Sequence, residues 1–224
     1  MCGRYTTPAE SEAERYFTVH LLHWQFQARY NVAPSQPVPV VRLQEGVREG
    51  ILLRWGLVPF FAHGIPGSYS TINARIETLS NSPAYRGAWK RGQRCILPAS
   101  GFYEWHLNAD GSKQPFYIHA ADQPVFGFAG LWDASTRADG TVVQSCTIVT
   151  MPANPLLAEI HNAPGKQRMP AILHASDHET WLAGSAAAAY AVLQPYPADC
   201  MLAWPVSTRV NSPRHDDASL IEAQ

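Results

Sequence analysis

The feature of this chain that most constrains its fold is a succession of short β-rich segments between residues 38 and 150. Each segment is rich in β-branched and aromatic residues and is bounded by Gly, Pro, Asn or Asp, and residues 108–111 and 138–140 have the composition of hairpin turns. This pattern predicts a sheet that is mainly antiparallel. The expected strands cover residues 38–43, 50–57, 69–78, 95–105, 114–119, 125–132 and 141–150.

Helical signals flank these segments. Thr7 is predicted to cap a helix N-terminus, with Pro8 at the first helical position and Glu10 closing a capping box, and this helix of about four turns would end at residue 21 or 22. One helix, many strands and then further helices predict an α+β fold in a single domain of residues 1–213. Toward the C-terminus we expect helices over residues 154–161, 176–183 (capped by Ser176) and 185–193, a last strand over 205–210 and a loose, flexible tail over 214–224.

Length and composition exclude several classes of protein. A chain of 224 residues buries enough surface to fold without disulfides or a structural metal, and its four cysteines lie far apart with no CxxC pair. No apolar stretch approaches the ~20 residues of a membrane helix, and residues 1–17 are polar where a secretory signal would be apolar. We therefore expect a cytoplasmic protein with no membrane association and no metal ion. We also expect a monomer, and the sequence implies no cofactor.

Charge is distributed unevenly along this chain. The net charge is −1, yet residues 54–100 include six basic side chains and a single acidic one, Glu77, and arginines outnumber lysines 14 to 3. Guanidinium groups fit phosphate oxygens better than ammonium groups do. Residues 29–34 and 55–61 add aromatics and prolines in loops, which suits stacking against single-stranded nucleic acid. A solvated basic face and ordinary core packing explain the same residues equally well.

Cys2 carries the sharpest chemical implication. Removal of Met1 would expose an α-amine with a pKa of about 7.7–8.0, of which roughly a tenth is unprotonated at neutral pH, and a thiol two carbons away. An aldehyde captured by this amine as a Schiff base would be trapped by sulfur in a five-membered thiazolidine ring. A thiol here also suits an N-terminal-nucleophile amidohydrolase, and a cysteine at position 2 can equally be accidental.

Polar residues elsewhere could support such chemistry. Period-two alternation over residues 70–78 puts Asn73, Arg75 and Glu77 on one face of a strand. Glu104 is embedded among aromatics, so burial would raise its pKa and make it a proton donor and acceptor, unless it pairs structurally with Arg75.

A histidine completes this set of candidates. His161 ends the predicted helix 154–161, and histidine is the residue type that titrates near neutral pH, as proton transfer in Schiff-base chemistry requires. A lone histidine is also a common structural residue. No histidine spacing matches a metal-ligand motif.

Taken together, these segments resemble the SRAP family of SOS-response-associated, abasic-site processing proteins. The match runs nearly from end to end, with its pieces in the family's order. The matching segments are residues 1–5, 29–34, 55–56, 72–77 and 101–105, His161, and residues 168–170 and 204–207.

The resemblance implies a compact, barrel-like, mainly antiparallel β domain with flanking helices, which captures abasic sites in single-stranded DNA covalently. Cys2 would be the cross-linking nucleophile, and Asn73, Glu104 and His161 the catalytic groups around it. Self-removal of Met1, a peptidase-type reaction, and a weak lyase-type activity on abasic DNA are implied as well. The implied DNA contacts are Arg4, Arg75 and Arg168 with phosphates, and Pro34, Phe60, Phe61 and Trp105 along the strand.

Two features depart from the family pattern. Six residues separate His161 from Arg168, where the family places a compact His-Asp-Arg-Met-Pro run, and Phe60 and Phe61 stand where relatives have tryptophan. Three alternatives stay open: an amidohydrolase that uses the Cys2 thiol, a single-stranded DNA-binding protein without catalysis, and a peptidase that acts on other proteins. The sequence identifies no replication partner.

Overall fold

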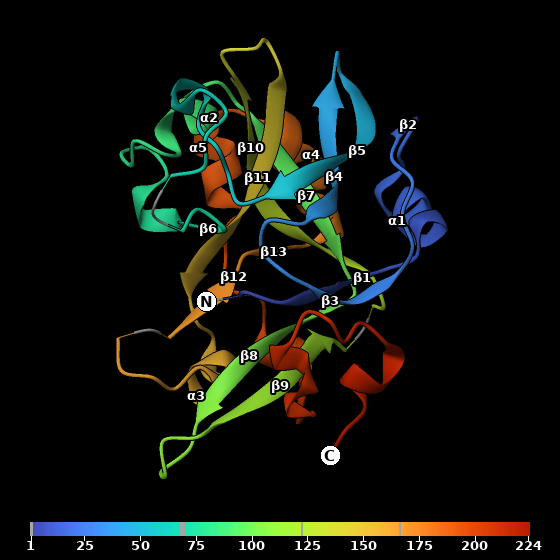
Figure 1. The fold of residues 1–224 in the computed structure, drawn as a ribbon, viewed down its shortest axis with the longest axis vertical. Helices are drawn as coiled ribbons and strands as arrows, with labels where there is room; N and C mark the ends of the chain where they lie inside the picture. The colour runs from blue at the N-terminus through green and yellow to red at the C-terminus, as the bar shows by residue number, and fades with distance from the viewer. Residues whose placement is uncertain (1, 68–69, 122, 166) are drawn as a thin grey trace.

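The computed structural model describes residues 2–67, 70–121, 123–165 and 167–224, and Figure 1 labels its elements. The α-helices are α1 (Glu10–Phe17), α2 (Arg86–Lys90), α3 (Pro155–Ile160), α4 (His178–Ala183) and α5 (Ala186–Ala191). The strands are β1 (Tyr5–Thr7), β2 (Leu21–His23), β3 (Arg29–Val32), β4 (Pro37–Gln44), β5 (Val47–Trp55), β6 (Asn73–Arg75), β7 (Arg94–Ala99), β8 (Gly101–Leu107), β9 (Lys113–Ala120), β10 (Phe126–Thr136), β11 (Val142–Pro152), β12 (Arg168–Pro170), β13 (Ile172–Leu173) and β14 (Met201–Pro205).

The described strands form two sheets, of which the larger fills the upper part of Figure 1 and the smaller the lower part. The smaller sheet has the order β14-β9-β8-β1-β3. The larger follows the path β12-β11-β10-β7-β4-β5-β2, with β13 attached to β10 and β6 to β11. Most of these pairs are antiparallel, and β2–β5, β5–β11 and β6–β11 are parallel. The predicted α+β fold, a mainly antiparallel sheet with flanking helices, is confirmed.

The larger sheet closes into a barrel because β11 pairs with β5 as well as with β10. Cys146 of β11 lies opposite Trp55 of β5, which joins β5, β4, β7, β10 and β11 into a ring. Closure leaves these strands without an exposed edge. Tyr5 of β1 packs edge-on against Trp55 and Phe128, with ring centroids 5.3 and 5.8 Å apart. This aromatic contact fixes the N-terminal strand of the smaller sheet against the barrel core.

The chain passes from the barrel into the smaller sheet at Ser100. Residues 95–105, predicted as one strand, form β7 in the barrel and β8 in the other sheet. Gly101 begins β8 against the Tyr117 ring, where a Cβ atom would lie 2.2 Å from the Tyr117 hydroxyl oxygen. A glycine is therefore required at this bend, and it fixes the point where β8, the strand that carries Glu104, leaves the barrel.

The N-terminal helix is shorter than predicted and starts later. The Thr7 hydroxyl accepts a hydrogen bond from the Arg29 amide (3.0 Å), so Thr7 belongs to the sheet and does not cap the helix. α1 is stabilised instead by Glu12, whose carboxylate accepts a hydrogen bond from the Ala9 amide (2.9 Å). The helix ends where Thr18 adopts the left-handed conformation (φ 51°). The prediction was wrong because a β-strand contact competes for the capping hydroxyl.

The helices after β11 follow the sequence more closely. The helices expected over residues 154–161 and 185–193 are present as α3 and α5, and Asn154 and Ser185 accept hydrogen bonds from backbone amides at their starts. Ser176, the predicted cap of a helix over residues 176–183, instead lies inside a 3-10 turn that precedes α4. That prediction of a cap was wrong.

The strand predicted over residues 205–210 is wrong. This stretch leaves β14 at its start and enters a 3-10 turn, Thr208–Asn211, that places Val210 in a small core with Tyr103 and Tyr117. A polar Ser207 caps the turn by accepting a hydrogen bond from the Arg209 amide. The alternation of residue types therefore reflects a capped turn and not a strand.

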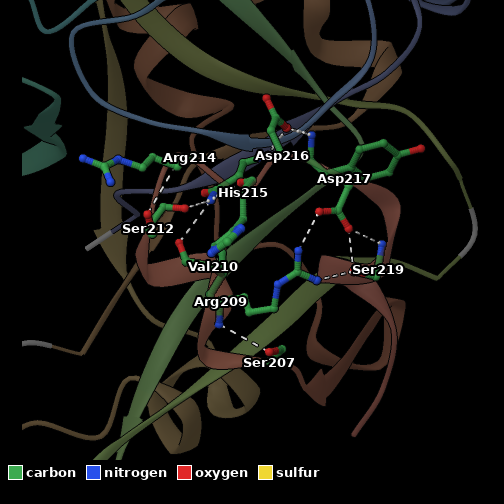
Figure 2. A network of polar contacts seen from close by, with 11 residues as sticks. Ser207, Arg209, Val210, Ser212, Arg214, His215, Asp216, Asp217 and Ser219 are labelled. Atoms are coloured by element: carbon green, nitrogen blue, oxygen red, sulfur yellow. Dashed lines mark hydrogen bonds and ion pairs between the residues drawn. The ribbon is translucent and has the colours of Figure 1, made fainter.

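Residues 214–224, predicted as a loose tail, pack against the smaller sheet. The Asp216 carboxylate accepts hydrogen bonds from the backbone amides of Tyr30 (2.6 Å) and Asn31 (2.9 Å) in β3. Figure 2 shows Asp217 bonded to Ser219 at the start of the last 3-10 turn, in which Leu220 is fully buried. These contacts with distant strands hold a segment whose own composition gave no sign of order.

Candidate active site

Four residues from distant parts of the chain meet where the two sheets join. Cys2 precedes β1, Asn73 begins β6, Glu104 lies in β8 and His161 follows α3. Figure 1 shows β6 and α3 on the left side of the molecule, with β8 next to α3. All four side chains are buried, with residue exposures between 0 and 9%. The fold thus brings together the residues that the sequence marked as candidate catalytic groups.

The backbone of Cys2 is held by an asparagine. The Asn73 Nδ2 atom donates a hydrogen bond to the Cys2 carbonyl oxygen (2.8 Å). Asn73 is itself fixed because its backbone lies opposite Ile148 of β11 and its carbonyl oxygen accepts a hydrogen bond from the Tyr85 hydroxyl (3.0 Å). The Asn73 Oδ1 atom is buried and has no hydrogen-bond partner among the described residues. An unsatisfied buried acceptor beside Cys2 is suited to a ligand that donates a hydrogen bond.

The Cys2 side chain lies beside β8. β1 pairs antiparallel with the start of β8, and the Tyr103 amide donates to the Arg4 carbonyl oxygen (3.0 Å), so the pairing continues toward Cys2. Burial raises the pKa of the Cys2 thiol far above its ordinary value, and the nearby charge of Glu104 raises it further. The thiol is therefore held protonated, and its use as a nucleophile requires a base close by.

Glu104 can exchange a proton near neutral pH. It is 2% exposed, and burial raises its pKa to about 7. The nearest oxygen of Glu104 lies 3.8 Å from His161 Nδ1, which is also 3.3 Å from the Arg168 carbonyl oxygen. The structural pairing of Glu104 with Arg75 that the sequence left open is not present, because the Arg75 side chain is exposed and forms no hydrogen bond or ion pair with a described residue. The site therefore juxtaposes a thiol, a carboxyl and an imidazole.

The segment around Asn73 departs from the predicted strand. Of residues 69–78, Tyr69 lies outside the described residues, Asn73–Arg75 form β6, and Ile76–Thr78 form a 3-10 turn. Asn73 is buried and Arg75 is exposed, so the expected shared polar face does not extend along the whole segment. The turn rotates Glu77 away from that face.

Glu77 instead engages Arg168 of β12. Its two carboxylate oxygens accept hydrogen bonds from the two terminal nitrogens of Arg168 at 2.9 and 3.0 Å, and Arg168 also donates to the Thr150 carbonyl oxygen (2.8 Å). The pKa of Glu77 is lowered, mainly by these hydrogen bonds. The guanidinium expected to meet a phosphate is thus already bound by a carboxylate, and a phosphate would have to share it.

A cavity of about 580 Å³ opens from Glu104 and His161 toward the surface. Trp105 forms part of its wall and donates a hydrogen bond from Nε1 to Asn211 Oδ1 (2.9 Å), and the Arg4 guanidinium reaches the Asn211 carbonyl oxygen (3.5 Å). The other wall residues are Leu107, Lys113 and Ala163. Sequence reasoning missed Leu107, Lys113, Ala163 and Asn211, because they reach the cavity through turns and the end of a hairpin that carry no periodic signal.

Phe60 and Phe61 form a separate aromatic surface. They are 52 and 46% exposed in a 3-10 turn, with their rings 5.5 Å apart and edge to face. Together with α2 they line a shallow pocket of about 280 Å³, in which Arg91 lies 4.7 Å over the Phe60 ring. Pro34 is half-buried in the turn between β3 and β4, and it lines neither this pocket nor the cavity beside Glu104.

The basic segment divides into two groups. Arg94 donates to the Trp181 carbonyl oxygen, Arg91 pairs with Asp133, and Arg54 donates to the Gly56 carbonyl oxygen, so these guanidinium groups hold the fold together. The other three cations are exposed, and their side chains form no hydrogen bond or ion pair with a described residue. They are Arg75, Arg86 and Lys90.

The remaining titratable groups form no metal-ligand arrangement among the described residues. In the four described stretches of chain, no three His, Cys, Asp or Glu side chains come together as a cluster that could hold a metal ion. Cys95 and Cys146 are buried free thiols, as expected for core residues, and Cys200 is partly exposed. No helix in the described part of the chain is both long and apolar enough to cross a bilayer.

Comparison with known proteins identifies the family of this chain. The model of the SOS response associated peptidase (SRAP) family matches residues 1–213. The abasic site processing protein YoqW of Bacillus subtilis is 36% identical over 230 residues that cover all of both chains, and YedK of Escherichia coli is 32% identical over 200 residues, covering 87% of this chain and 84% of YedK. A crystal structure of a protein from Bordetella bronchiseptica, 31% identical, covers 92% of this chain and all of its own with a TM-score of 0.82. The resemblance inferred from the sequence is confirmed: the chain belongs to the SRAP family of abasic site processing proteins.

Proposed function

We propose that this protein captures abasic sites in single-stranded DNA by forming a thiazolidine between Cys2 and the ring-opened sugar aldehyde, after Met1 has been removed. The observation that carries the proposal is the buried junction in which Asn73, Glu104 and His161 lie around Cys2. An N-terminal cysteine in such a junction offers an amine, a thiol and nearby proton-transfer groups at once.

The relatives support the choice of substrate. YoqW and YedK are both named abasic site processing proteins. A sugar that has lost its base opens to an aldehyde, and an aldehyde is the electrophile that an adjacent amine and thiol trap together. The exposed Arg75 beside Asn73 would add attraction for the neighbouring phosphates.

The bond changes can be followed atom by atom. The Cys2 amine adds to the aldehyde carbon to give a carbinolamine, which loses one water to form a Schiff base. The thiol then adds across the C=N bond, its sulfur to carbon and its proton to nitrogen. Glu104, with a pKa of about 7, accepts the proton that the amine loses and returns one to the departing hydroxyl, and His161 relays protons to it. Aldehyde and aminothiol thus give a thiazolidine and one water.

Two further activities belong to this proposal. Hydrolysis of the Met1–Cys2 peptide bond consumes one water, releases methionine and frees the amine, which makes it the peptidase-type step. The Schiff base is also the intermediate from which an abasic strand breaks by β-elimination, so a weak lyase activity competes with ring closure. Closure by sulfur removes the imine, and the cross-link thereby protects the strand.

The first prediction tests the nucleophile. Incubated with a single-stranded oligonucleotide carrying one abasic site, the parent protein should form an adduct that survives a denaturing gel without reduction. Cys2→Ser keeps an amine but lacks the thiol, so it should give an adduct only when borohydride reduces the Schiff base. A tetrahydrofuran analogue, which has no aldehyde, is the matched DNA control and should remain unmodified.

Mass spectrometry of the reaction products shows whether the predicted adduct has formed. The adduct should have the summed mass of the methionine-free protein and the oligonucleotide, less one water. Methionine-free protein that leaves the abasic oligonucleotide unmodified would contradict the proposal. In that case release of ammonia from glutamine would indicate an amidohydrolase, and DNA binding that Cys2→Ser leaves unchanged would indicate a non-catalytic binding protein.

A further inference from the structure

The residue after His161 makes an unusual set of contacts with β8. Asn162 Oδ1 accepts a hydrogen bond from the Leu107 amide (2.8 Å), and Asn162 Nδ2 donates to the Leu107 carbonyl oxygen (3.0 Å). One side-chain amide therefore satisfies both backbone groups of a strand residue, as a neighbouring strand would. The pairing is possible because Asn108 already bonds across the hairpin to Ser112, and alternate residues of an antiparallel ladder direct their backbone groups outward.

A histidine completes the hydrogen bonding of this amide. His106 Nδ1 lies 3.0 Å from the Glu159 carbonyl oxygen, and its Nε2 lies 3.4 Å from Asn162 Nδ2. A proton on Nδ1 leaves Nε2 as an acceptor, so the second hydrogen of the Asn162 amide is directed at His106. The end of α3 is thus tied to β8 at two successive residues, His106 and Leu107.

These hydrogen bonds join the two segments that carry the candidate catalytic residues Glu104 and His161. β8 carries Glu104 three residues before Leu107, and His161 immediately precedes Asn162. His161 lies beyond the last helical residue, with φ −88° and ψ 59°, so the helix does not by itself fix the direction of the imidazole. The distances from Nδ1 to the Arg168 carbonyl oxygen and to Glu104 are long, 3.3 and 3.8 Å, so a small backbone shift would change the distance between the imidazole and the carboxyl.

We propose that Asn162 is a positioning residue that holds the His161 imidazole against Glu104 by clamping the chain to Leu107. The clamp also places Ala163 in the wall of the cavity that Glu104 and His161 line. The expected effect of Asn162 on the rate of cross-linking rests on the proposed function, whereas its expected effect on the position of the His161 imidazole does not. Asn162 touches neither Cys2 nor the cavity, and it acts through His161.

The second prediction follows from this clamp. Asn162→Ala should slow cross-linking about tenfold and change its pH profile, because a misplaced proton-transfer group affects the chemical step. The affinity for the tetrahydrofuran oligonucleotide, measured by fluorescence anisotropy, should stay within about twofold. Asn162→Asp keeps the acceptor for the Leu107 amide but loses the donor, and it should have an intermediate rate. Asn108→Ala, which removes an asparagine contact on the same hairpin, is the matched control and should react like the parent.

A second readout needs no DNA. The titration midpoint of His161, followed by NMR and assigned with His161→Gln, should differ between the parent and Asn162→Ala because the distance from the imidazole to Glu104 changes. If the His161 midpoint differs between the parent and Asn162→Ala while the parent forms no adduct, the clamp is supported and the proposed function is contradicted. An unchanged midpoint together with an unchanged rate in folded Asn162→Ala, checked by circular dichroism, would overturn the clamp.

Discussion

Glu104 shows at the scale of one residue how burial couples chemistry to stability. Burial raises the pKa of its carboxyl from 4.5 to about 7. Between these two values the folded protein binds a proton that the unfolded chain releases. The stability that comes from the protonated form is therefore fully present below pH 4.5 and is lost as the pH rises through 7. The same property that suits Glu104 to proton transfer makes it costly at alkaline pH.

The third prediction follows from this loss of folding stability with rising pH. Glu104→Gln removes the charge, so its free energy of unfolding should exceed that of the parent by an amount that is small near pH 4.5 and grows to at most about 3 kcal/mol above pH 7. Urea unfolding at a series of pH values measures the difference. Glu77→Gln should behave in the opposite way, since the Arg168 hydrogen bonds lower the pKa of Glu77, and it should lose stability above pH 4.5. A Glu104→Gln difference that does not vary with pH would contradict the assignment.

Single residues also show how far the sequence could predict the site. The aromatic surroundings of Glu104 indicated a buried carboxyl with a raised pKa, and the structure confirms it. The engagement of Arg168 by Glu77 was not predictable, because it depends on a 3-10 turn that ends β6 early and rotates Glu77 toward β12. Local alternation reports the face of a residue only while the strand continues.

At the scale of elements, the C-terminal segment shows what local patterns leave out. Its composition resembles a disordered tail, yet Asp216 bonds two backbone amides of β3 and pairs with Arg29 (2.8 Å). Asn31, fully buried, donates in turn to the carbonyl oxygen of His215 in the segment and to those of Val210 and Ser212 just before it. The longer strands β4, β5 and β7–β11 were predicted closely because alternation and turn residues are local signals, whereas this segment is ordered by partners some 180 residues away.

The fourth prediction compares two neighbouring aspartates of this segment. Asp216→Ala leaves two backbone amides without their acceptor and should lower the free energy of unfolding by about 1–3 kcal/mol. Asp217→Ala removes an exposed pair with Arg209 and hydrogen bonds from the Ser219 hydroxyl and amide, and it should lower the free energy of unfolding less than Asp216→Ala does. Urea unfolding of both variants provides the comparison. Equal losses would show that the segment is not held through Asp216.

The net charge of the molecule conceals an uneven distribution of charged side chains over its surface. The chain carries a net charge of −1, but Arg86 and Lys90 are exposed on α2 without partners among the described residues and line the pocket beside Phe60 and Phe61. Cations next to exposed aromatic rings combine phosphate attraction with base stacking. A DNA strand that enters the junction at Cys2 and passes Arg75 would continue over this surface. Each of its phosphates that contacts a cation there would release a counterion.

The fifth prediction concerns the number of counterions that are released when DNA binds. For a single-stranded oligonucleotide with the tetrahydrofuran analogue, the logarithm of the binding constant should fall linearly with the logarithm of salt concentration. Arg86→Ala and Lys90→Ala should each reduce the magnitude of that slope by about 0.7, the contribution of one phosphate contact on single-stranded DNA. Arg15→Ala, which removes an exposed cation from α1 on the opposite side of Figure 1, is the matched control and should leave the slope unchanged. If the two α2 variants keep the parent slope while Arg75→Ala lowers it, the DNA leaves the junction by another route, and the Phe60 and Phe61 surface is not part of its path.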